Sequence, residues 1–167
     1  MPRLFPAVAL ALSVALPAQQ AAALSCLAPD PLRSLQEAAA SDETYRVLLG
    51  RLDFDAEALP VSGPAGPVAG LSEAPLVRAE FEGHALGAEG FDTAANGTLA
   101  IEPGCLGEVC GNAVPGEEVL IFARVTEAGM VIDLDPCQGW LQPAPSDAQQ
   151  AQMAACVSGG EDCPAAD

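Results

Sequence analysis

The spacing of apolar residues predicts one helix early in the chain and another near its end. Asp30 followed by Pro31 is typical of a helix start, because aspartate caps free backbone N–H groups and proline suits the first helical position. The residues that follow recur at helical spacing and predict a helix over about residues 31–41: Leu32, Leu35 and Ala39. A second helix is predicted over about residues 147–156, because its start has the spacing of a capping box, Ser146 and Gln149.

Between these helices the period changes to two, which predicts β-strands. The first predicted strand runs from Thr44 to Phe54 and contains a one-residue phase slip at Gly50. A glycine at a phase slip suggests a β-bulge that bends the strand. Residues 56–74 are rich in proline and glycine and lack periodicity, so we predict a long surface loop there.

Four further strands are predicted after this loop. Residues 77–85 alternate apolar and charged side chains, which is typical of a half-buried strand. A short strand over residues 98–102 is expected to follow a turn at Asn96-Gly97, a turn dipeptide. Residues 118–125 and 130–134, separated by a glycine-containing turn, are expected to pair as a hairpin.

The element order, helix, five strands and helix, sets the expected fold. Helices do not alternate with strands, so parallel βαβ units are not expected and an antiparallel, closed or nearly closed sheet is the economical arrangement. We therefore predict a mainly β protein. Its expected architecture is a five-stranded antiparallel Greek-key barrel of oligonucleotide/oligosaccharide-binding (OB) topology, flanked by an N-terminal and a C-terminal helix.

Residues 1–23 are predicted to be a secretory signal peptide. Arg3 supplies the positive start, residues 5–16 the apolar run, and Ala21-Ala22-Ala23 the small-residue cleavage site. The run is too short for a resident transmembrane helix, and no later segment approaches the roughly 20 apolar residues needed. We therefore expect a periplasmic or secreted product without a transmembrane segment. Residues 24–167 are expected to form a single domain.

The signal makes the six cysteines candidates for disulfides, because exported proteins meet oxidising conditions. They are Cys26, Cys105, Cys110, Cys137, Cys156 and Cys163. Six cysteines allow fifteen pairings. Proximity along the chain favours Cys105 with Cys110 and Cys156 with Cys163, which leaves Cys26 to pair with Cys137. We do not expect a lipid anchor at Cys26, because lipidation would leave an odd number of thiols.

Charge narrows the class of partner. The whole chain has a net charge of −17, and removing Arg3 with the signal leaves five arginines against 23 carboxylates, or −18, with no lysine at all. Such a surface repels phosphate backbones and anionic lipids, so nucleic acid is not an expected partner. An unknown protein or small ligand, basic if charged, is expected instead. The signal and the lysine-free composition favour a bacterial origin.

Four segments together resemble the netrin-like module, the domain shared with tissue inhibitors of metalloproteinases. They are Cys26 before PLRSLQEAA, YRVLLGRLDF, GEEVLIFA from Gly116, and MVIDLDPC, and they occur in the order of that family over roughly residues 26–156. The resemblance implies an OB barrel flanked by helices and a disulfide between Cys26 and Cys137. It also implies a secreted, non-enzymatic binding module.

The same resemblance suggests a second function, inhibition of a metalloproteinase by the N-terminal segment around Cys26. Such inhibitors present a free cysteine amine at the mature N-terminus in a Cys-x-Cys pattern. Here Leu24 and Ser25 precede Cys26, and no cysteine stands two residues after it. Cleavage directly before Cys26 would restore the free amine.

Three further features bear on chemistry. Glu80, Glu82 and His84 share one face of a predicted strand and could hold a divalent metal, although solvated surface charge is the simpler interpretation. A hydrolytic triad needs a histidine base, and His84 is the sole candidate. No serine stands in a G-x-S-x-G motif. We therefore predict no enzyme activity and no cofactor. Trp140 is a candidate partner contact together with Cys26, or else packs on the disulfide and caps the barrel.

Overall fold

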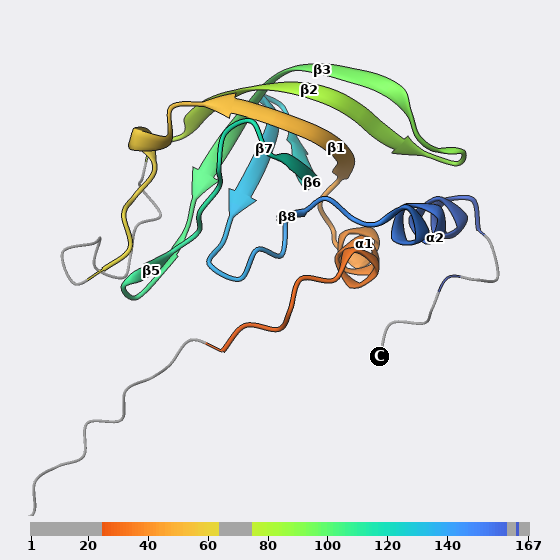
Figure 1. Ribbon diagram of the computed structural model, residues 1–167, viewed down its shortest axis with the longest axis horizontal. Coiled ribbons are helices and arrows are strands. Elements are labelled where there is room, and N and C mark those ends of the chain that lie inside the picture. The colour runs from red at the N-terminus through yellow and green to blue at the C-terminus, as the bar shows by residue number, and fades with distance from the viewer. Residues whose placement is uncertain (1–24, 64–74, 160–162, 164–167) are drawn as a thin grey trace, which may run out of the picture.

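The computed structural model describes residues 25–63, 75–159 and 163, and shows a mainly β protein with two α-helices (Figure 1). The predicted signal peptide and most of the predicted loop over residues 56–74 lie outside the described residues. The elements in chain order are α1 (Pro31–Ala40), β1 (Tyr45–Phe54), the 3₁₀ helix η1 (Ala56–Ala58), β2 (Val77–Gly87), β3 (Gly90–Pro103), β4 (Cys105–Leu106), β5 (Val109–Cys110), β6 (Glu118–Thr126), β7 (Gly129–Leu134), β8 (Leu141–Pro143) and α2 (Asp147–Val157).

Both predicted helices are present and begin at the predicted caps. The Asp30 carboxylate accepts hydrogen bonds from the backbone N–H groups of Leu32 and Arg33, at 3.0 and 3.3 Å. At α2 the Ser146 and Gln149 side chains each accept from the other residue's backbone N–H, which completes a capping box. Local capping chemistry therefore determines where each helix starts.

The main sheet is mixed, so the prediction of an antiparallel sheet is wrong in one pairing. The strand order is β1-β2-β3-β7-β6-β8, and β1 also pairs with β6. All of these pairs are antiparallel except β3 with β7, which is parallel. Pairing thus runs from β1 through β2, β3, β7 and β6 back to β1. A cycle of five strands cannot alternate in direction throughout, so at least one neighbouring pair must be parallel.

The predicted β-bulge at Gly50 is absent, because β1 pairs without a break with both of its neighbours. Gly50 lies opposite Gly83 of β2 and opposite Val119 of β6. The phase slip has another cause: on one face of β1, Tyr45 and Val47 pack against a buried cluster to which α1 and α2 contribute, whereas beyond Gly50 that face is exposed to solvent. A register shift does occur elsewhere, between Ala85 and Leu86 in the pairing of β2 with β3.

Glycines at positions 50 and 83 allow β1 and β2 to approach closely. A Cβ added at Gly50 would overlap the carbonyl oxygen of Glu82 and lie 2.8 Å from Cε2 of Phe81. A Cβ added at Gly83 would overlap the carbonyl oxygen of Leu49 in the same way. The aromatic ring of Phe81 therefore occupies the space over this glycine pair, where any larger residue would displace it.

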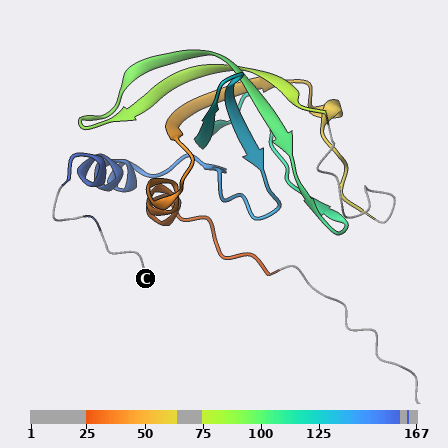
Figure 2. The same cartoon turned by 180° about the vertical axis from the view of Figure 1, so that it is seen from behind.

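Strand β3 is much longer than predicted, and the expected turn at Asn96-Gly97 is wrong. Asn96 and Gly97 lie inside β3, opposite Glu82 and Phe81 of β2, and the chain reverses at residues 88–89 instead. The resulting β2–β3 hairpin projects past the rest of the sheet toward α2 in both views (Figures 1 and 2). Residues 92–98 are mostly small and polar, so they show no alternation although they form a strand.

Two hydrophobic clusters stabilise this arrangement. The larger one is enclosed by the inner faces of the strands and includes Leu48, Leu52, Phe81, Leu99, Ile101, Ile121 and Ile132. The second lies between the sheet and the helices, centred on Leu120, Phe122 and the fully buried Met153. The predicted β6–β7 hairpin is confirmed. Of the described helices, neither has the length and apolar character required to cross a membrane.

Candidate binding site at the disulfide-held end

Three disulfides link the six cysteines in the pairs that proximity along the chain favoured. They are Cys26–Cys137, Cys105–Cys110 and Cys156–Cys163. Three disulfides are typical of an oxidising, extracellular or periplasmic environment. Two of these bonds lie where β7 ends, and we call this region, residues 25–30, 105–110 and 135–140, the disulfide-held end.

The loop at residues 135–140 is ordered by one carboxylate. The Asp135 side chain accepts hydrogen bonds from the backbone N–H groups of Cys137 and Gly139, at 2.7 and 2.9 Å. Gln138 between them has a φ of 57°, in the left-handed region that non-glycine residues rarely occupy. Two charge-assisted hydrogen bonds hold the backbone in this conformation, and Cys137 is thereby positioned for its disulfide.

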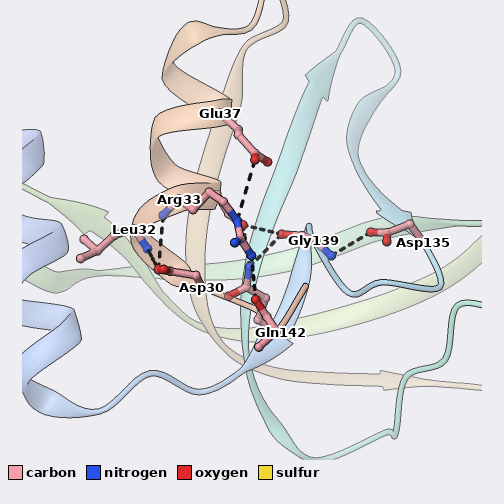
Figure 3. Close-up of polar contacts among 9 residues, drawn as sticks. Asp30, Leu32, Arg33, Glu37, Asp135, Gly139 and Gln142 are labelled. Carbon is pink, nitrogen blue, oxygen red and sulfur yellow. Dashed lines mark hydrogen bonds and ion pairs between the residues drawn. The ribbon is translucent and has the colours of Figure 1, made fainter. Parts of the chain in front are cut away.

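Buried polar side chains join this loop to α1 (Figure 3). The Gly139 carbonyl oxygen accepts from Ser34 Oγ and from Gln142 Nε2, both at 2.9 Å, and Gln142 Nε2 also donates to Ser34 Oγ at 2.7 Å. Ser34 and Gln142 are only 2% and 1% exposed. Hydrogen bonds between buried or part-buried groups are costly to break, so this network ties α1 to the loop.

Residues 25–30 are exposed, yet they are tied to the domain at both ends. The Cys26–Cys137 disulfide fixes one end, and Asp30 is the N-cap of α1 at the other. Arg33 adds a hydrogen bond from Nη2 to the Ala28 carbonyl oxygen at 2.7 Å, and Figure 3 shows Arg33 reaching across the start of the helix with Glu37 beside it. Between these ties Leu27 is 73% exposed.

The Cys105–Cys110 disulfide closes a two-stranded hairpin, β4 and β5, whose base packs on the end of β7. Gly104 donates its backbone N–H to the Leu134 carbonyl oxygen at 2.9 Å, and a Cβ at Gly111 would overlap that same carbonyl group. At the tip, the apolar cross-strand pair Leu106 and Val109 is largely exposed. The hairpin therefore presents apolar side chains on a rigid support.

A small cavity of about 150 Å³ lies beside the loop at residues 135–140. Polar groups line it together with apolar side chains of β6 and β8; they are Asn112, Glu117, Glu118, Gln138 and Gln142. Within the described residues, Oε1 of Gln142 has no hydrogen-bond partner although it is buried. A recess lined partly by polar groups thus lies beside the exposed apolar positions of the disulfide-held end.

Trp140 lies in the cluster under the helices. Its ring stacks on Tyr45 with centroids 4.7 Å apart and meets the edge of Phe122 at 6.1 Å. It is half-buried, and its backbone carbonyl accepts from Phe122 N–H at 2.8 Å. These contacts give Trp140 a packing role on the helix side of the sheet. Of the two predicted partner contacts, Cys26 is thus the exposed one.

Ion pairs connect side chains of three strands next to Trp140 and Tyr45. Arg124 of β6 makes hydrogen-bonded ion pairs with Asp133 of β7 at 2.8 Å and with Glu102 of β3 at 3.0 Å. The hydrogen bonds to Asp133 raise the pKa of Arg124. Burial, followed by the charge of Asp133, raises the pKa of the Tyr45 hydroxyl above its ordinary value of 10.0.

The candidate metal residues Glu80, Glu82 and His84 do share one exposed face of β2, as the strand period predicts. Glu80 accepts from Thr98 Oγ1 at 3.1 Å and pairs with Arg78 at 3.3 Å. Glu80 and Glu82, without His84, line a shallow cavity of about 380 Å³ that also includes Arg51 and Asp53. Among the described side chains, no three His, Cys, Asp or Glu residues are arranged to hold a metal ion.

Comparison with known proteins returns no relatives. The chain matches no protein-family model, no curated protein and no solved structure.

Two elements in or next to the disulfide-held end were not predicted. Strand β8, which carries Gln142, was not predicted, because three residues are too few to show a period. The hairpin of β4 and β5 was not among the predicted strands either. Its signal was the placement of Cys105 and Cys110 on either side of Leu106, Gly107, Glu108 and Val109, which matches a tight disulfide-closed turn.

Proposed function

We propose that this protein is an exported, non-enzymatic binding module of the netrin-like type, built on an OB barrel, and that it contacts a protein partner through its disulfide-held end. The observation that carries the proposal is the joint arrangement of two features. The strand pairings run in a closed cycle of five, and a disulfide ties the segment before α1 to the residues after the last strand of that cycle.

The strand pairings support the barrel. In an OB barrel the first strand pairs with the second and with the fourth, and the third and fifth strands are parallel neighbours. Here β1 pairs with β2 and β6, and β3 is parallel to β7, which supports assigning β1, β2, β3, β6 and β7 to the five places in order. The buried cluster of Leu48, Ile121 and Ile132 fills the interior that such a barrel would have.

The disulfide-held end is suited to a protein partner because its apolar positions are exposed on a rigid backbone. Leu27 is 73% exposed and Leu106 is 60% exposed, and both stand next to a disulfide. A preorganised contact surface loses little conformational entropy on binding, so more of the contact energy appears as affinity. The net charge of −17 on the chain favours a neutral or basic partner.

Site-specific photo-crosslinking in the producing cell tests this function. A benzophenone amino acid replaces Leu27 or Leu106, and the matched control replaces Glu82, which is exposed on β2 away from the disulfide-held end. We expect one defined adduct of the same mass from both test positions and none from the control. Absence of an adduct, or equal adducts from all three positions, would contradict the proposal.

A second function, inhibition of a metalloproteinase, is favoured by the exposure of residues 25–30 and the covalent fixing of Cys26. A zinc-binding mechanism of that kind needs the free amine of Cys26 at the mature N-terminus. N-terminal sequencing of exported protein decides the matter: a start at Cys26 supports an inhibitor, whereas a start at Leu24 removes the mechanism.

A further inference from the structure

The long strand β3 has one free edge within the described part of the chain. Phe91 and residues 93–99 pair with β2 on one side, with Asp92 at the register shift, whereas on the other side β7 begins to pair only at Ala100. The backbone N–H and C=O groups along such an edge are available to another strand. Natural edges are commonly protected by charges or proline, yet residues 91–98 contain one charged residue, Asp92, and no proline.

A pocket of about 220 Å³ opens beside this edge, where β7 begins. Its apolar lining comes from three strands: Phe81 of β2, Ala95 and Leu99 of β3, and Met130 of β7. Phe81 and Leu99 belong to the buried core, so the pocket has a firm floor. With this volume and apolar lining, the pocket can receive one aliphatic side chain from a strand that lies along the edge.

Arg46 of β1 completes the lining of this pocket and brings a positive charge to it. No carboxylate of the described residues lies within 4.0 Å of the Arg46 guanidinium, whereas Arg33, Arg78 and Arg124 all make ion pairs. Arg51 of the same strand also makes no such ion pair among the described residues, but it does not line this pocket. Arginine presents a planar fork of donors that fits a carboxylate.

We propose that β3 and this pocket bind the C-terminal segment of a partner polypeptide in extended form. The peptide adds as a strand along residues 92–98, its last side chain, an aliphatic one, enters the pocket, and its terminal carboxylate pairs with Arg46. Strand addition supplies main-chain hydrogen bonds, while the pocket and the arginine supply the selectivity. A second copy of this chain is a poor occupant, because each carries a large negative charge.

This surface is separate from the disulfide-held end. Met130 lies at the start of β7, whereas Leu134 and the loop at residues 135–140 lie at its finish. The inference therefore goes beyond the proposed function and can fail without it.

Selection from a library of short random peptides displayed with free C-termini tests the inference, using the exported oxidised protein as bait. We expect enrichment of peptides that end in Leu, Ile, Val or Met. A synthetic copy of an enriched peptide should bind about tenfold more weakly when its carboxylate is amidated, since a charge-assisted hydrogen bond is lost.

Two arginine variants provide the matched comparison. Arg46→Gln should lose the same tenfold, and should no longer distinguish the free acid from the amide. Arg51→Gln changes an exposed arginine of the same strand that also has no carboxylate within 4.0 Å among the described residues, and should bind like the unchanged protein. Thermal unfolding of both variants checks that they fold.

Backbone amide resonances locate the bound peptide. Shifts and slowed hydrogen exchange at residues 92–98 are the expected result. The inference is overturned if no peptide is enriched, if Arg46→Gln binds as well as Arg51→Gln, or if the protein self-associates through β3 instead. Shifts confined to Leu27, Leu106 and their neighbours would also overturn it, and would favour the disulfide-held end as the binding surface.

Discussion

Removal of the Cys26–Cys137 disulfide should destabilise the fold far more than removal of Cys105–Cys110. The perturbations are the paired variants Cys26→Ser with Cys137→Ser, and Cys105→Ser with Cys110→Ser. Each paired variant removes one disulfide and replaces its two sulfur atoms by hydroxyl groups of similar size. The sequence separations closed by the two bonds are 111 and 5 residues.

The magnitudes follow from the entropy of closing a loop in the unfolded chain. On the chain-entropy relation a separation of 111 corresponds to about 5 kcal/mol at 25 °C and a separation of 5 to about 2 kcal/mol. The larger figure is comparable with the whole stability of many domains, which is roughly 5–15 kcal/mol. The variant without Cys26–Cys137 is therefore expected to be marginally stable at best.

Urea unfolding of the oxidised proteins, followed by tryptophan fluorescence, measures the difference. Trp140 suits this purpose because it lies in the cluster between the helices and the sheet. We expect the free energy of unfolding to fall by about 5 and about 2 kcal/mol in the two variants. Equal losses, or a larger loss from the Cys105–Cys110 variant, would refute the reasoning that the long-range bond is the principal staple.

Three further measurements test the packing and the electrostatics. Gly83→Ala should lose about 1–3 kcal/mol of stability, because the added Cβ would meet the Leu49 carbonyl and the Phe81 ring. The control Gly87→Ala, whose added Cβ would have its nearest contact at 3.5 Å, should change stability little. A similar loss from both variants would contradict the close approach of β1 and β2. Met153→Ala should lower the free energy of unfolding by about 2–5 kcal/mol, because it leaves a cavity in the buried cluster. The control Gln152→Ala, on the exposed side of α2, should leave the stability unchanged. Equal unfolding midpoints for the two variants would mean that α2 is not packed on the sheet. Ultraviolet titration of Tyr45, the one tyrosine in the chain, should give a midpoint above pH 10.0. Because the folded protein then holds the hydroxyl proton more tightly than the unfolded chain does, the free energy of unfolding should fall as the pH rises past 10.0. A titration midpoint at or below 10.0 would contradict the burial of Tyr45.

The helices and the β6–β7 hairpin could be predicted because their signals are local. Asp30 and Ser146 cap the helices through atoms within three residues of themselves, and the hairpin turns directly before Gly129, between two apolar runs. The cysteine pairs could also be anticipated, because two of the bonds close short loops and only one pair is then left.

The errors arose where distant parts of the chain determine the environment. The apparent slip at Gly50 reflects helices that cover only the first half of one face of β1. Over residues 92–98, strand β3 pairs with β2 alone. This stretch has no buried face, so its sequence lacks the alternation of apolar and polar residues that would predict a strand. The parallel pairing of β3 with β7 is a property of the whole cycle of strands, which no single segment encodes.

The candidate site was predictable in part. Cys26 was expected to be joined to Cys137, but the network of Ser34, Gly139 and Gln142 beside that bond depends on a contact between residues more than a hundred positions apart. Trp140 was assigned to the barrel end or to a partner, whereas its stacking on Tyr45 places it under the helices. Side-chain roles of this kind follow from tertiary packing.

The most direct test of the account is the state of the six cysteines in protein collected from outside the cytoplasm. The material is alkylated without reductant and its mass measured intact, and its proteolytic fragments are then identified. We predict no alkylated thiol and a fragment in which Cys26 is joined to Cys137. Alkylation at Cys26 and Cys137 in folded protein would contradict the account, because the covalent tie at the disulfide-held end would then be absent.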